Sequence, residues 1–394
     1  MKGPMLNVEE IRPVWAEINL DHLRNNIIEI RKLVKKETLI CAVVKADAYG
    51  HGAKVVTKTL LENGVDRLAV GTLSEAIELR KIGYDVPLMI LGYTPEVQGK
   101  EVLNYNIISA VYSYKQACQF SQIATKEGKT MTLHIKVDTG MSRLGFQVEE
   151  KYIEEIKKIF YLPNINVEGI FTHFATADEG DKSFTREQFG KFSKLVKVLE
   201  EDGYKIPIKH VSNSAAVIDL PEMNLDMVRP GIILYGLYPS EEVDNQKLKL
   251  KPVMQLKAKV SHIKTLSKDR GVGYGLEYKT DGERKIATLP VGYADGFSRR
   301  LSGEIEVIAK DKRMPIVGRI CMDQCMADAT GMDIDIEDEV TLFSDIVGSG
   351  NTFDDIARKL GTINYEILCM IGRRVPRAYI KDNEIIYIQD NLLI

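Results

Sequence analysis

Several side chains that can do chemistry follow directly after short apolar runs. Lys45 comes after Ala42–Val44, His173 comes after Val167–Thr172, and Arg229 ends a third such stretch. If these runs are parallel strands of a barrel, such residues gather at the C-terminal face, where barrel enzymes place their reactive groups. A lysine that emerges there is partly desolvated, which lowers its pKa and frees its amine to form a Schiff base. A strand-end lysine held in a salt bridge is the alternative.

Two further segments have the residue types of a phosphate site. Ser212-Asn-Ser214 and Arg229-Pro-Gly-Ile232 end the last two apolar runs of the first part of the chain. Barrel phosphate sites are commonly built from the loops after strands seven and eight, with backbone N–H groups facing the anion. Ser214 is expected to cap a short helix, and Gly231 lets the backbone approach closely. A lysine after strand one and a phosphate cradle match the needs of pyridoxal phosphate.

Arg229 narrows the chemistry that such a cofactor would support. A carboxylate facing the pyridine nitrogen keeps it protonated and makes the ring a strong electron sink, whereas a guanidinium keeps its own proton. The weaker sink favours return of a proton to the α-carbon over transamination. A structural arginine bonded to barrel carbonyls is the alternative.

The elements that must position these residues follow one pattern in the first part of the chain and another in the second part. Eight short apolar runs alternate with amphipathic helices such as Leu20–Val34, at roughly 24 residues per repeat, which predicts a (β/α)8 barrel. The expected strands are Leu39–Val44, Arg67–Val70, Pro87–Leu91, Ile107–Val111, Thr132–Val137, Val167–Thr172, Ile208–Val211 and Leu225–Val228. A doubly wound open sheet is the alternative, although no GxGxxG follows the first strand.

After Pro239 the pattern changes to short β-rich pieces separated by Asp, Gly and Lys turns. The expected pieces are Val253–Thr265, Arg284–Leu289, Glu304–Ile308, Met314–Val317 and Glu339–Leu342. One helical stretch, Phe353–Met370, is expected to start at an N-cap on Thr352. We therefore predict an α/β barrel domain over residues 1–239 and a mainly antiparallel β domain over 240–394, with Val14–Ile18 as a strand that pairs with the second domain.

Composition limits the partners of the chain. The 394 residues carry a formal net charge of −3, which gives no support for nucleic-acid binding. No run approaches the ~18 apolar residues of a membrane span, and the N-terminus lacks the apolar core of a signal peptide. Five cysteines form no CxxC pair, and the spacing of Cys321 and Cys325 has no matching His/Cys pair for zinc. A cytoplasmic protein with reduced thiols and no metal is expected.

Seven segments resemble the alanine racemase family, in the family's order and from about Val14 to Arg377. They are Val43–Gly52, Lys136–Arg143, Val228–Ile232, Gly273–Gly275, Val291–Gly296, Gly318–Gln324 and Thr362–Glu366. The family has an N-terminal barrel and a C-terminal β domain, which agrees with the two patterns found along this chain. The resemblance also implies a head-to-tail homodimer.

The resemblance implies a role for each matching residue. Lys45 would hold pyridoxal phosphate as a Schiff base and then act as the base for one enantiomer. Tyr274, lent by the partner subunit, would be the opposite base, with its pKa lowered by His173 coupled to Arg229. A racemase needs acid/base groups on both faces of a planar carbanion, because one base alone mostly restores the original configuration.

The resemblance also assigns binding and entrance residues. Phosphate would be bound by Tyr49, Ser214, Gly231 and Ile232. Arg143 would contact the phenolic oxygen of the ring and the substrate, and Met322 with Asp323 would lie near the substrate carboxylate. The entrance would be formed by Tyr293, Arg299 and Arg319.

The resemblance leaves the state of Lys136 and the role of Arg373 undecided. The lysine that matches Lys136 is carbamylated in some members, which creates an anion that orients Arg143; an unmodified lysine paired with an acidic neighbour is the alternative. Where some members carry a phosphate-contacting tyrosine, this chain has Arg373. That residue would meet the phosphate or turn outwards.

The predicted function is interconversion of L- and D-alanine, which supplies D-alanine for peptidoglycan. A racemase of broader specificity, for serine or a basic amino acid, is the nearest alternative. The related decarboxylases are disfavoured because their Glu-Pro-Gly-Arg segment is absent. A non-catalytic pyridoxal-phosphate homeostasis protein is a further alternative, but those proteins lack a second domain.

Overall fold

The computed structural model describes residues 8–393, which form two compact units. The barrel unit holds residues 24–48 and 53–250. The sheet unit holds the described residues up to 23, residues 49–52 and residues 251–393. The first seven residues of the predicted barrel domain and Ile394 lie outside the described residues, and the predicted division at residue 239 stays a prediction.

The barrel unit contains the eight predicted parallel strands. They run in the order β10-β2-β3-β4-β5-β6-β8-β9, and all their pairings are parallel. The strands are β2 (Leu39–Val43), β3 (Arg67–Val70), β4 (Leu88–Ile90), β5 (Ile108–Val111), β6 (Met131–Asp138), β8 (Ile165–Phe171), β9 (Ile208–His210) and β10 (Met227–Val228). Backbone hydrogen bonds from Asp226 to Lys209 and from Arg229 to Ser212 link the two ends, so the barrel is nearly closed.

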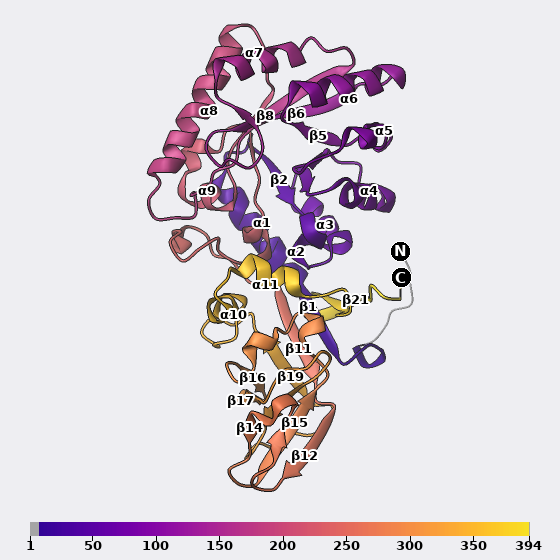
Figure 1. The fold of residues 1–394 in the computed structure, drawn as a ribbon, viewed down its shortest axis with the longest axis vertical. Coiled ribbons are helices and arrows are strands. Elements are labelled where there is room, and N and C mark those ends of the chain that lie inside the picture. The colour runs from indigo at the N-terminus through magenta and orange to yellow at the C-terminus, as the bar shows by residue number, and fades with distance from the viewer. Residues whose placement is uncertain (1–7, 394) are drawn as a thin grey trace. The chain divides into compact units, whose positions relative to one another are not determined.

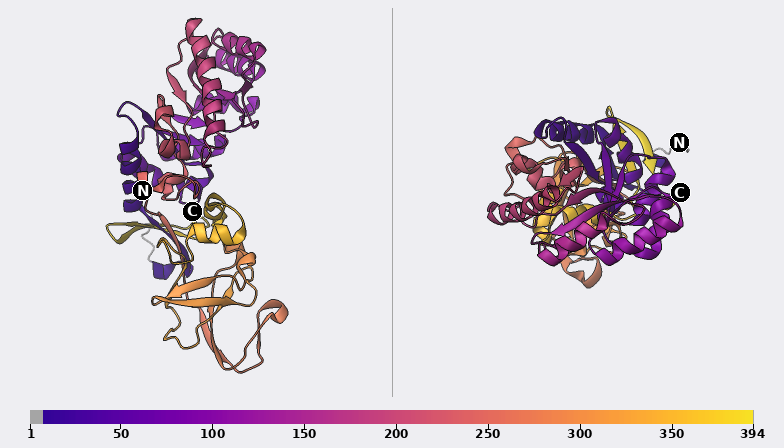
Figure 2. Two further views of the ribbon diagram at one scale, coloured as in Figure 1. Left: turned by 90° about the vertical axis from the view of Figure 1, so that its left-hand side faces the viewer. Right: turned by 90° about the horizontal axis from the view of Figure 1, so that it is seen from above.

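Helices surround these strands (Figures 1 and 2). They are α1 (Leu20–Leu33), α3 (Ala53–Glu62), α4 (Leu73–Ile82), α5 (Gly99–Asn104), α6 (Tyr114–Lys126), α7 (Glu150–Ile159), α8 (Ser183–Glu201) and α9 (Ser214–Asp219). The strands are covered on both faces, which is why they read as continuous apolar runs in the sequence. β5, for example, is buried along its whole length. The open-sheet alternative is wrong, because the order of the strands returns to its start.

The sheet unit is built on ten strands, and its pairings are antiparallel except that of β1 (Val14–Asn19) with β20 (Arg377–Lys381). On its other side β1 pairs with β11 (Met254–Lys259), so the predicted strand at Val14–Ile18 joins this sheet. The remaining strands are β12 (His262–Leu266), β15 (Arg284–Leu289), β16 (Glu306–Ala309), β17 (Lys312–Val317), β18 (Cys325–Asp328), β19 (Glu339–Phe343) and β21 (Glu384–Gln389). A separate hairpin joins β13 (Gly271–Val272) and β14 (Tyr278–Lys279).

The predicted helical stretch in this unit is two helices, α10 (Phe353–Leu360) and α11 (Asn364–Met370). Thr352 is the N-cap of α10, as expected, and forms a capping box with Asp355. Gly361 ends α10 because its φ of 69° places it in the left-handed region that terminates helices. No helix in residues 8–393 is long and apolar enough to cross a membrane.

Candidate active site

Lys45 opens an unusual turn after β2. Residues 46 to 49 have φ values of 52° to 54°, a left-handed helical conformation that L-residues seldom adopt. Glu75 accepts a hydrogen bond from the Ala46 N–H at 2.6 Å, and the Asp47 carboxylate accepts one from the Ala53 N–H at 2.7 Å. The turn directs the chain away from the strand end. Lys45 itself is exposed in this chain, and the predicted partial desolvation of its amine stays a prediction.

The predicted site residues of the barrel unit converge around His173. Burial lowers the pKa of His173 well below its usual range, and four cations add to the effect. In decreasing order these cations are Arg229, Lys136, Arg143 and Lys45. They come from β6, the loop after it and the ends of β2 and β10. The barrel mouth therefore concentrates positive charge, as a site for an anionic molecule requires.

Arg229 is buried at the centre of this cluster. Its guanidinium donates hydrogen bonds to the carbonyls of Thr172 and Val211, at 2.8 and 3.0 Å. It also contacts His210 Nδ1 at 2.7 Å and His173 Nδ1 at 3.4 Å. These are the carbonyl contacts of a structural arginine, yet its Nε–H has no hydrogen-bond partner among the described residues. Burial lowers the pKa of Arg229 to about 10, which leaves it charged at neutral pH.

A chain of hydrogen bonds runs from Arg229 through the barrel. Because a guanidinium only donates, His210 Nδ1 accepts, and the His210 Nε2–H then donates to His134 Nδ1 at 2.8 Å. The His134 Nε2–H in turn donates to the Glu168 carboxylate at 2.9 Å. Arg67 holds the same carboxylate with two hydrogen bonds of 2.7 and 3.0 Å. These hydrogen bonds orient the imidazoles of His210 and His134 and fix the Arg229 guanidinium.

The predicted phosphate segments lie against each other. The Gly231 N–H donates to Ser214 Oγ at 2.9 Å, which joins the loops after β9 and β10. Ile232 is fully buried and opens the short helix η4 (Ile232–Tyr235). The expected helix cap on Ser214 is wrong. Asn213 is the N-cap of α9, since its side chain accepts from the Ala216 N–H, and this leaves the Ser214 hydroxyl for Gly231.

Lys136 is buried on β6, with its amine 4.5 Å from the centre of the Phe171 ring. Burial, followed by Arg229 and Arg143, lowers the pKa of Lys136 well below its usual range. Within residues 8–393 no carboxylate forms an ion pair with Lys136, although the charge of Asp138 acts against the lowering of its pKa. Carbamylation of Lys136 and an unmodified lysine with an acidic neighbour both stay predictions.

The remaining predicted site residues belong to the sheet unit. Tyr49 is buried beside Tyr365, and burial raises its pKa, followed by an effect of Cys369. Tyr274 opens η6 (Tyr274–Leu276) in the β13–β14 hairpin and is 70% exposed. Arg373 is also exposed. The phosphate contact predicted for Tyr49 stays a prediction.

Three loops bring the substrate and entrance residues of the sheet unit close together. The N–H of Tyr293, at the start of η7 (Tyr293–Asp295), donates to the Cys321 carbonyl at 3.1 Å, just before Met322. In the β13–β14 hairpin, a Cβ added to Gly275 would lie 3.2 Å from the Arg319 guanidinium, and Arg319 is ion-paired with Glu277. Arg299 begins η8 (Arg299–Leu301), shortly after η7 along the chain.

A buried carboxylate fixes two of these loops. Asp295 is fully buried and accepts hydrogen bonds from Arg12 at 2.5 and 2.8 Å. Arg374 lies 3.6 Å from Asp295 and donates a 2.6 Å hydrogen bond to Asp323. Asp323 is therefore held by an arginine that also faces the buried Asp295.

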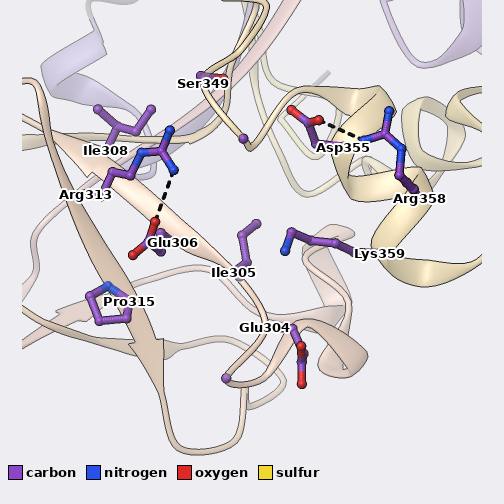
Figure 3. Close-up of a pocket in the computed structure, with 12 residues that line it drawn as sticks. Glu304, Ile305, Glu306, Ile308, Arg313, Pro315, Ser349, Asp355, Arg358 and Lys359 are labelled. Carbon is purple, nitrogen blue, oxygen red and sulfur yellow. Dashed lines mark hydrogen bonds and ion pairs between the residues drawn. The ribbon is translucent and has the colours of Figure 1, made fainter.

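The sheet unit also has a cavity of about 550 Å³ that none of the predicted site residues lines (Figure 3). Its walls are Gly303–Glu306, Ile308, Arg313, Pro315, Ser349, Gly350, Asp355, Arg358 and Lys359. Arg313 is paired with Glu306, and Arg358 with Asp355. Acidic and basic side chains are equal in number in the walls of this cavity, whereas the barrel mouth has an excess of basic side chains.

Sequence reasoning missed the relay of the buried His210 and His134 with the partly buried Glu168. A signal was present, because each of these polar residues directly adjoins an apolar residue in or next to its strand. Such a residue is buried only when it has a partner, so three of them on neighbouring strands indicate a network.

Comparison with known proteins agrees with this fold and site. The sequence profile "Alanine racemase, N-terminal domain" matches residues 18–239, and "Alanine racemase, C-terminal domain" matches residues 253–379. The chain is 52% identical to an alanine racemase of Clostridium tetani, over 97% of this chain and 99% of that one. It is also 52% identical to one of Clostridium perfringens, over 96% and 98%. A solved alanine racemase of Clostridium difficile superposes with a TM-score of 0.93 at 47% identity, over 96% of this chain and 99% of that one.

The barrel, the sheet unit and the cationic mouth thus define an amino-acid racemase, which is an isomerase. The chain belongs to the alanine racemase family. Its activity is the interconversion of L-alanine and D-alanine, and these relatives support that substrate rather than serine or a basic amino acid.

Proposed function

We propose that the chain racemises alanine with pyridoxal phosphate held at the barrel mouth, using Lys45 and Tyr274 of the partner subunit as opposing bases. The observation that carries this proposal is the convergence of Lys45, Arg143 and Arg229 around His173. In the unmodified chain this cluster holds more positive than negative charge. An anionic cofactor at the mouth offsets that excess.

The residues present fit such a cofactor. Lys45 is exposed at the end of β2, where its amine is accessible to an aldehyde. Ser214 and Gly231 are joined at the paired loops where barrels commonly bind phosphate. Both terminal nitrogens of the Arg229 guanidinium have hydrogen-bond partners in the barrel, and its Nε–H has none among the described residues. We assign it to the pyridine nitrogen, and Arg143 to the phenolic oxygen and the substrate.

When bound, pyridoxal phosphate acidifies the α-proton of an attached amino acid by drawing electron density away from the α-carbon. Arg229 limits this effect, because a guanidinium that stays charged at neutral pH does not pass a proton to the ring nitrogen. The relay from Arg229 to Glu168 keeps the guanidinium in one orientation. The chain therefore favours return of the proton to the α-carbon.

Racemisation needs a base on each face of that carbon. We assign one face to the Lys45 amine and the other to the phenol of Tyr274 of the partner subunit. A tyrosine is a weak base at neutral pH unless cations lower its pKa. In a composite site, the cations around His173 supply that positive potential.

A homodimer is supported by the exposed apolar face of the sheet unit. Tyr274, Leu276 and Met322 are 70%, 56% and 52% exposed, on loops that also carry Tyr293 and Arg319. Large apolar side chains grouped at one surface mark an interaction site. We propose that this face covers the barrel mouth of a second copy, with Met322 and Asp323 near the substrate carboxylate and Tyr293, Arg299 and Arg319 at the entrance.

We also propose that Lys136 is carbamylated. The unprotonated Lys136 amine adds to carbon dioxide and releases a proton to form a carbamate, and the burial and neighbouring cations that lower its pKa favour the unprotonated amine. The product replaces a buried cation with an anion beside Arg143. Intact-protein mass should show the addition of one CO₂, lost in acid. We further propose that the enzyme acts in the cytoplasm and supplies D-alanine for peptidoglycan.

Two variants test the assignment of the bases. Tyr274→Phe should lower racemisation by roughly 10²- to 10⁴-fold while the cofactor absorbance of the purified protein survives. Lys45→Ala should lose that absorbance together with the activity. The measurement is exchange of the alanine α-proton for deuterium, followed from each enantiomer.

A matched control is Tyr161→Phe, which makes the same change at an exposed tyrosine of the barrel unit and should racemise like the wild type. Equal racemisation by the wild type and Tyr274→Phe would remove the assigned role of Tyr274. Unchanged absorbance in Lys45→Ala would remove that of Lys45.

A further inference from the structure

Gln188 is a buried amide on α8 that touches the backbone of His173 and Ala175. Its Oε1 accepts a hydrogen bond from the Ala175 N–H at 2.9 Å, and its Nε2 donates to the His173 carbonyl at 3.3 Å. Its side chain has no exposed surface. An amide fits this place because one end must accept and the other must donate. Gln188 thus holds the backbone on both sides of Phe174, directly beside the imidazole of the site.

The same amide reaches the loop after β6. Its Nε2 also donates to Thr139 Oγ1 at 3.3 Å, and Thr139 is hydrogen-bonded to Thr172 Oγ1 at 2.9 Å. The Thr172 carbonyl in turn accepts from Arg229. A Cβ added to Gly140 would lie 3.6 Å from Gln188 Cγ, so the backbone of this loop packs on the same side chain. One residue therefore joins the loop that carries Arg143 to the loop that carries His173.

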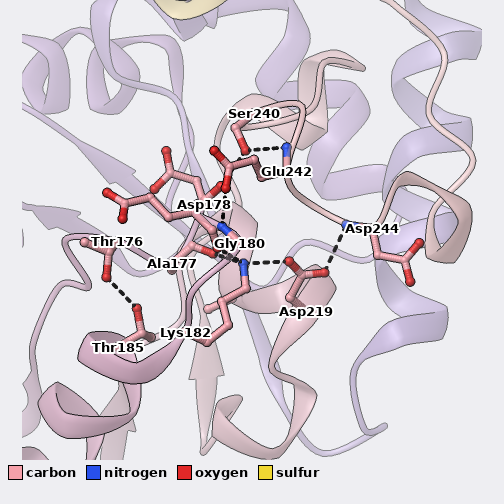
Figure 4. Close-up of polar contacts among 12 residues, drawn as sticks. Thr176, Ala177, Asp178, Gly180, Lys182, Thr185, Asp219, Ser240, Glu242 and Asp244 are labelled. Carbon is pink, nitrogen blue, oxygen red and sulfur yellow. Dashed lines mark hydrogen bonds and ion pairs between the residues drawn. The ribbon is translucent and has the colours of Figure 1, made fainter.

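The rest of the loop after β8 is anchored independently (Figure 4). The Lys182 amine donates to the carbonyls of Ala177 and Glu179 at 2.8 and 2.6 Å, and is ion-paired with Asp219 at 2.9 Å. Ser240 Oγ donates to the Asp178 carbonyl at 2.5 Å. None of these contacts involves Gln188, so we expect a change of Gln188 to act on residues 173–175 and on Thr139.

We propose that Gln188 is a positioning residue for racemisation: its amide sets the distance between the His173 imidazole and the Arg229 guanidinium by tying together the loops after β6 and β8. The proposal rests on the proposed function of His173 and Arg229. The charged groups that face His173 are Arg229, Lys136, Arg143 and Lys45. Displacement of the imidazole changes its contact with all four.

Gln188→Met tests the proposal, because it keeps the length of the side chain and removes both hydrogen-bonding ends. We expect kcat/KM to fall roughly ten- to a hundredfold in both directions, as for a small misplacement of a catalytic group. The second readout is the ¹⁵N spectrum of the His173 side chain in the cofactor-free protein. We expect the Nδ1 signal to lose the shift of a hydrogen-bond acceptor, and His173 to titrate at a higher pH than in the wild type.

The chain offers a matched control in Gln116 on α6. This glutamine is also buried, donates to the Thr94 carbonyl at 3.2 Å and accepts from the Tyr112 N–H at 3.4 Å. It makes the same kind of bridge between loops that carry no predicted site residue. Gln116→Met should leave kcat/KM and the His173 signals at their wild-type values. Equal effects of the two substitutions on these readouts would overturn the proposal.

Gln188→Glu gives a test that a purely structural role would not pass. An ionised carboxylate accepts from Ala175 but repels the His173 carbonyl, whereas a protonated carboxyl both accepts and donates. Its activity relative to the wild type should therefore be higher at about pH 6 than at about pH 9. A pH-independent ratio would contradict the assigned role of the amide.

If Gln188→Met does not fold, Thr139→Val cuts the link to the loop after β6 while keeping the shape of the side chain. It should lower kcat/KM and alter the His173 signals in the same direction, and wild-type behaviour would overturn the proposal. His173→Asn separates this inference from the proposed function. Full activity of that variant removes the role of His173 itself, whereas an unchanged His173 spectrum in Gln188→Met removes only the inference about Gln188.

Discussion

Two buried histidines, His134 and His210, and the partly buried His173 make the barrel sensitive to pH at the residue scale. Burial lowers the pKa of His134, His173 and His210 from the usual 6.5, and Arg229 adds to the effect at all three. At the other end of the relay, burial raises the pKa of Glu168, but hydrogen bonds from His134 and Arg67 outweigh it and bring the pKa to about 2. The native relay therefore consists of neutral imidazoles and an ionised carboxylate.

The histidines predict loss of stability as the pH falls below 6.5. In that range the unfolded chain binds protons that the folded chain excludes, and each such proton costs about 1.4 kcal/mol per pH unit of further acidification. His210→Gln keeps one acceptor and one donor but cannot bind a proton. Between about pH 6.5 and about pH 5, the plot of the free energy of unfolding against pH should therefore be shallower than that of the wild type, by the contribution of about one proton. The measurement is the free energy of unfolding in denaturant at several pH values.

His262→Gln is the control for this slope, because His262 is exposed on β12. Its slope should equal that of the wild type. A slope for His210→Gln that also equals the wild-type value would mean that His210 is protonated in the folded chain.

At the element scale, the left-handed turn after β2 is a strained connection in a functional place. Such a conformation costs about 1–2 kcal/mol per residue for a side chain with a Cβ. The cost is offset by the Glu75 and Asp47 hydrogen bonds, and Glu75 also accepts from the Gly71 and Thr72 N–H groups. One carboxylate therefore ties the turn after β2 to the loop after β3. This arrangement fixes the backbone of Lys45 while leaving its side chain exposed.

This strain predicts a stabilising substitution. Ala46→Gly should raise the free energy of unfolding by about 1 kcal/mol, because glycine adopts a positive φ without a steric cost. Ala76→Gly, within the right-handed helix α4, should instead lower it by about 1 kcal/mol or more. Denaturant unfolding of both variants measures the difference. A destabilised Ala46→Gly would show that this turn is not strained at residue 46.

At the scale of the whole molecule, the proposed composite site predicts complementation. Lys45→Ala and Tyr274→Phe protomers are each inactive alone. After exchange of subunits in equal mixture, a mixed dimer has one site with both substitutions and one with neither. About a quarter of all sites should then be intact, and activity should recover to about that fraction.

Mixing Lys45→Ala with Arg229→Ala is the control for complementation. Both residues belong to the barrel unit, so every site of the mixed dimer keeps one defect and activity should stay low. Recovery in the control, or its absence in the first mixture, would contradict a site shared between two copies.

The sequence by itself determined the barrel, its eight strands and most residues of the cationic mouth. Buried parallel strands must be apolar along their length, so each appears as an apolar run, and the residue after the run lies at the mouth. β3 and β15 coincide with their predicted ranges, and Lys45, His173 and Arg229 are found at strand ends as expected. Local sequence also determined the Thr352 cap, because capping involves only residues within one turn.

Only the tertiary structure decided which polar side chains pair with one another. The relay to Glu168 joins residues 76 and 34 positions apart at its two inner links, and Gln188 reaches Thr139 across 49 positions. No local pattern encodes such pairs, because they depend on which strands and helices become neighbours. The choice of Asn213 over Ser214 as helix cap has the same origin, since Ser214 is occupied by a glycine N–H 17 residues away.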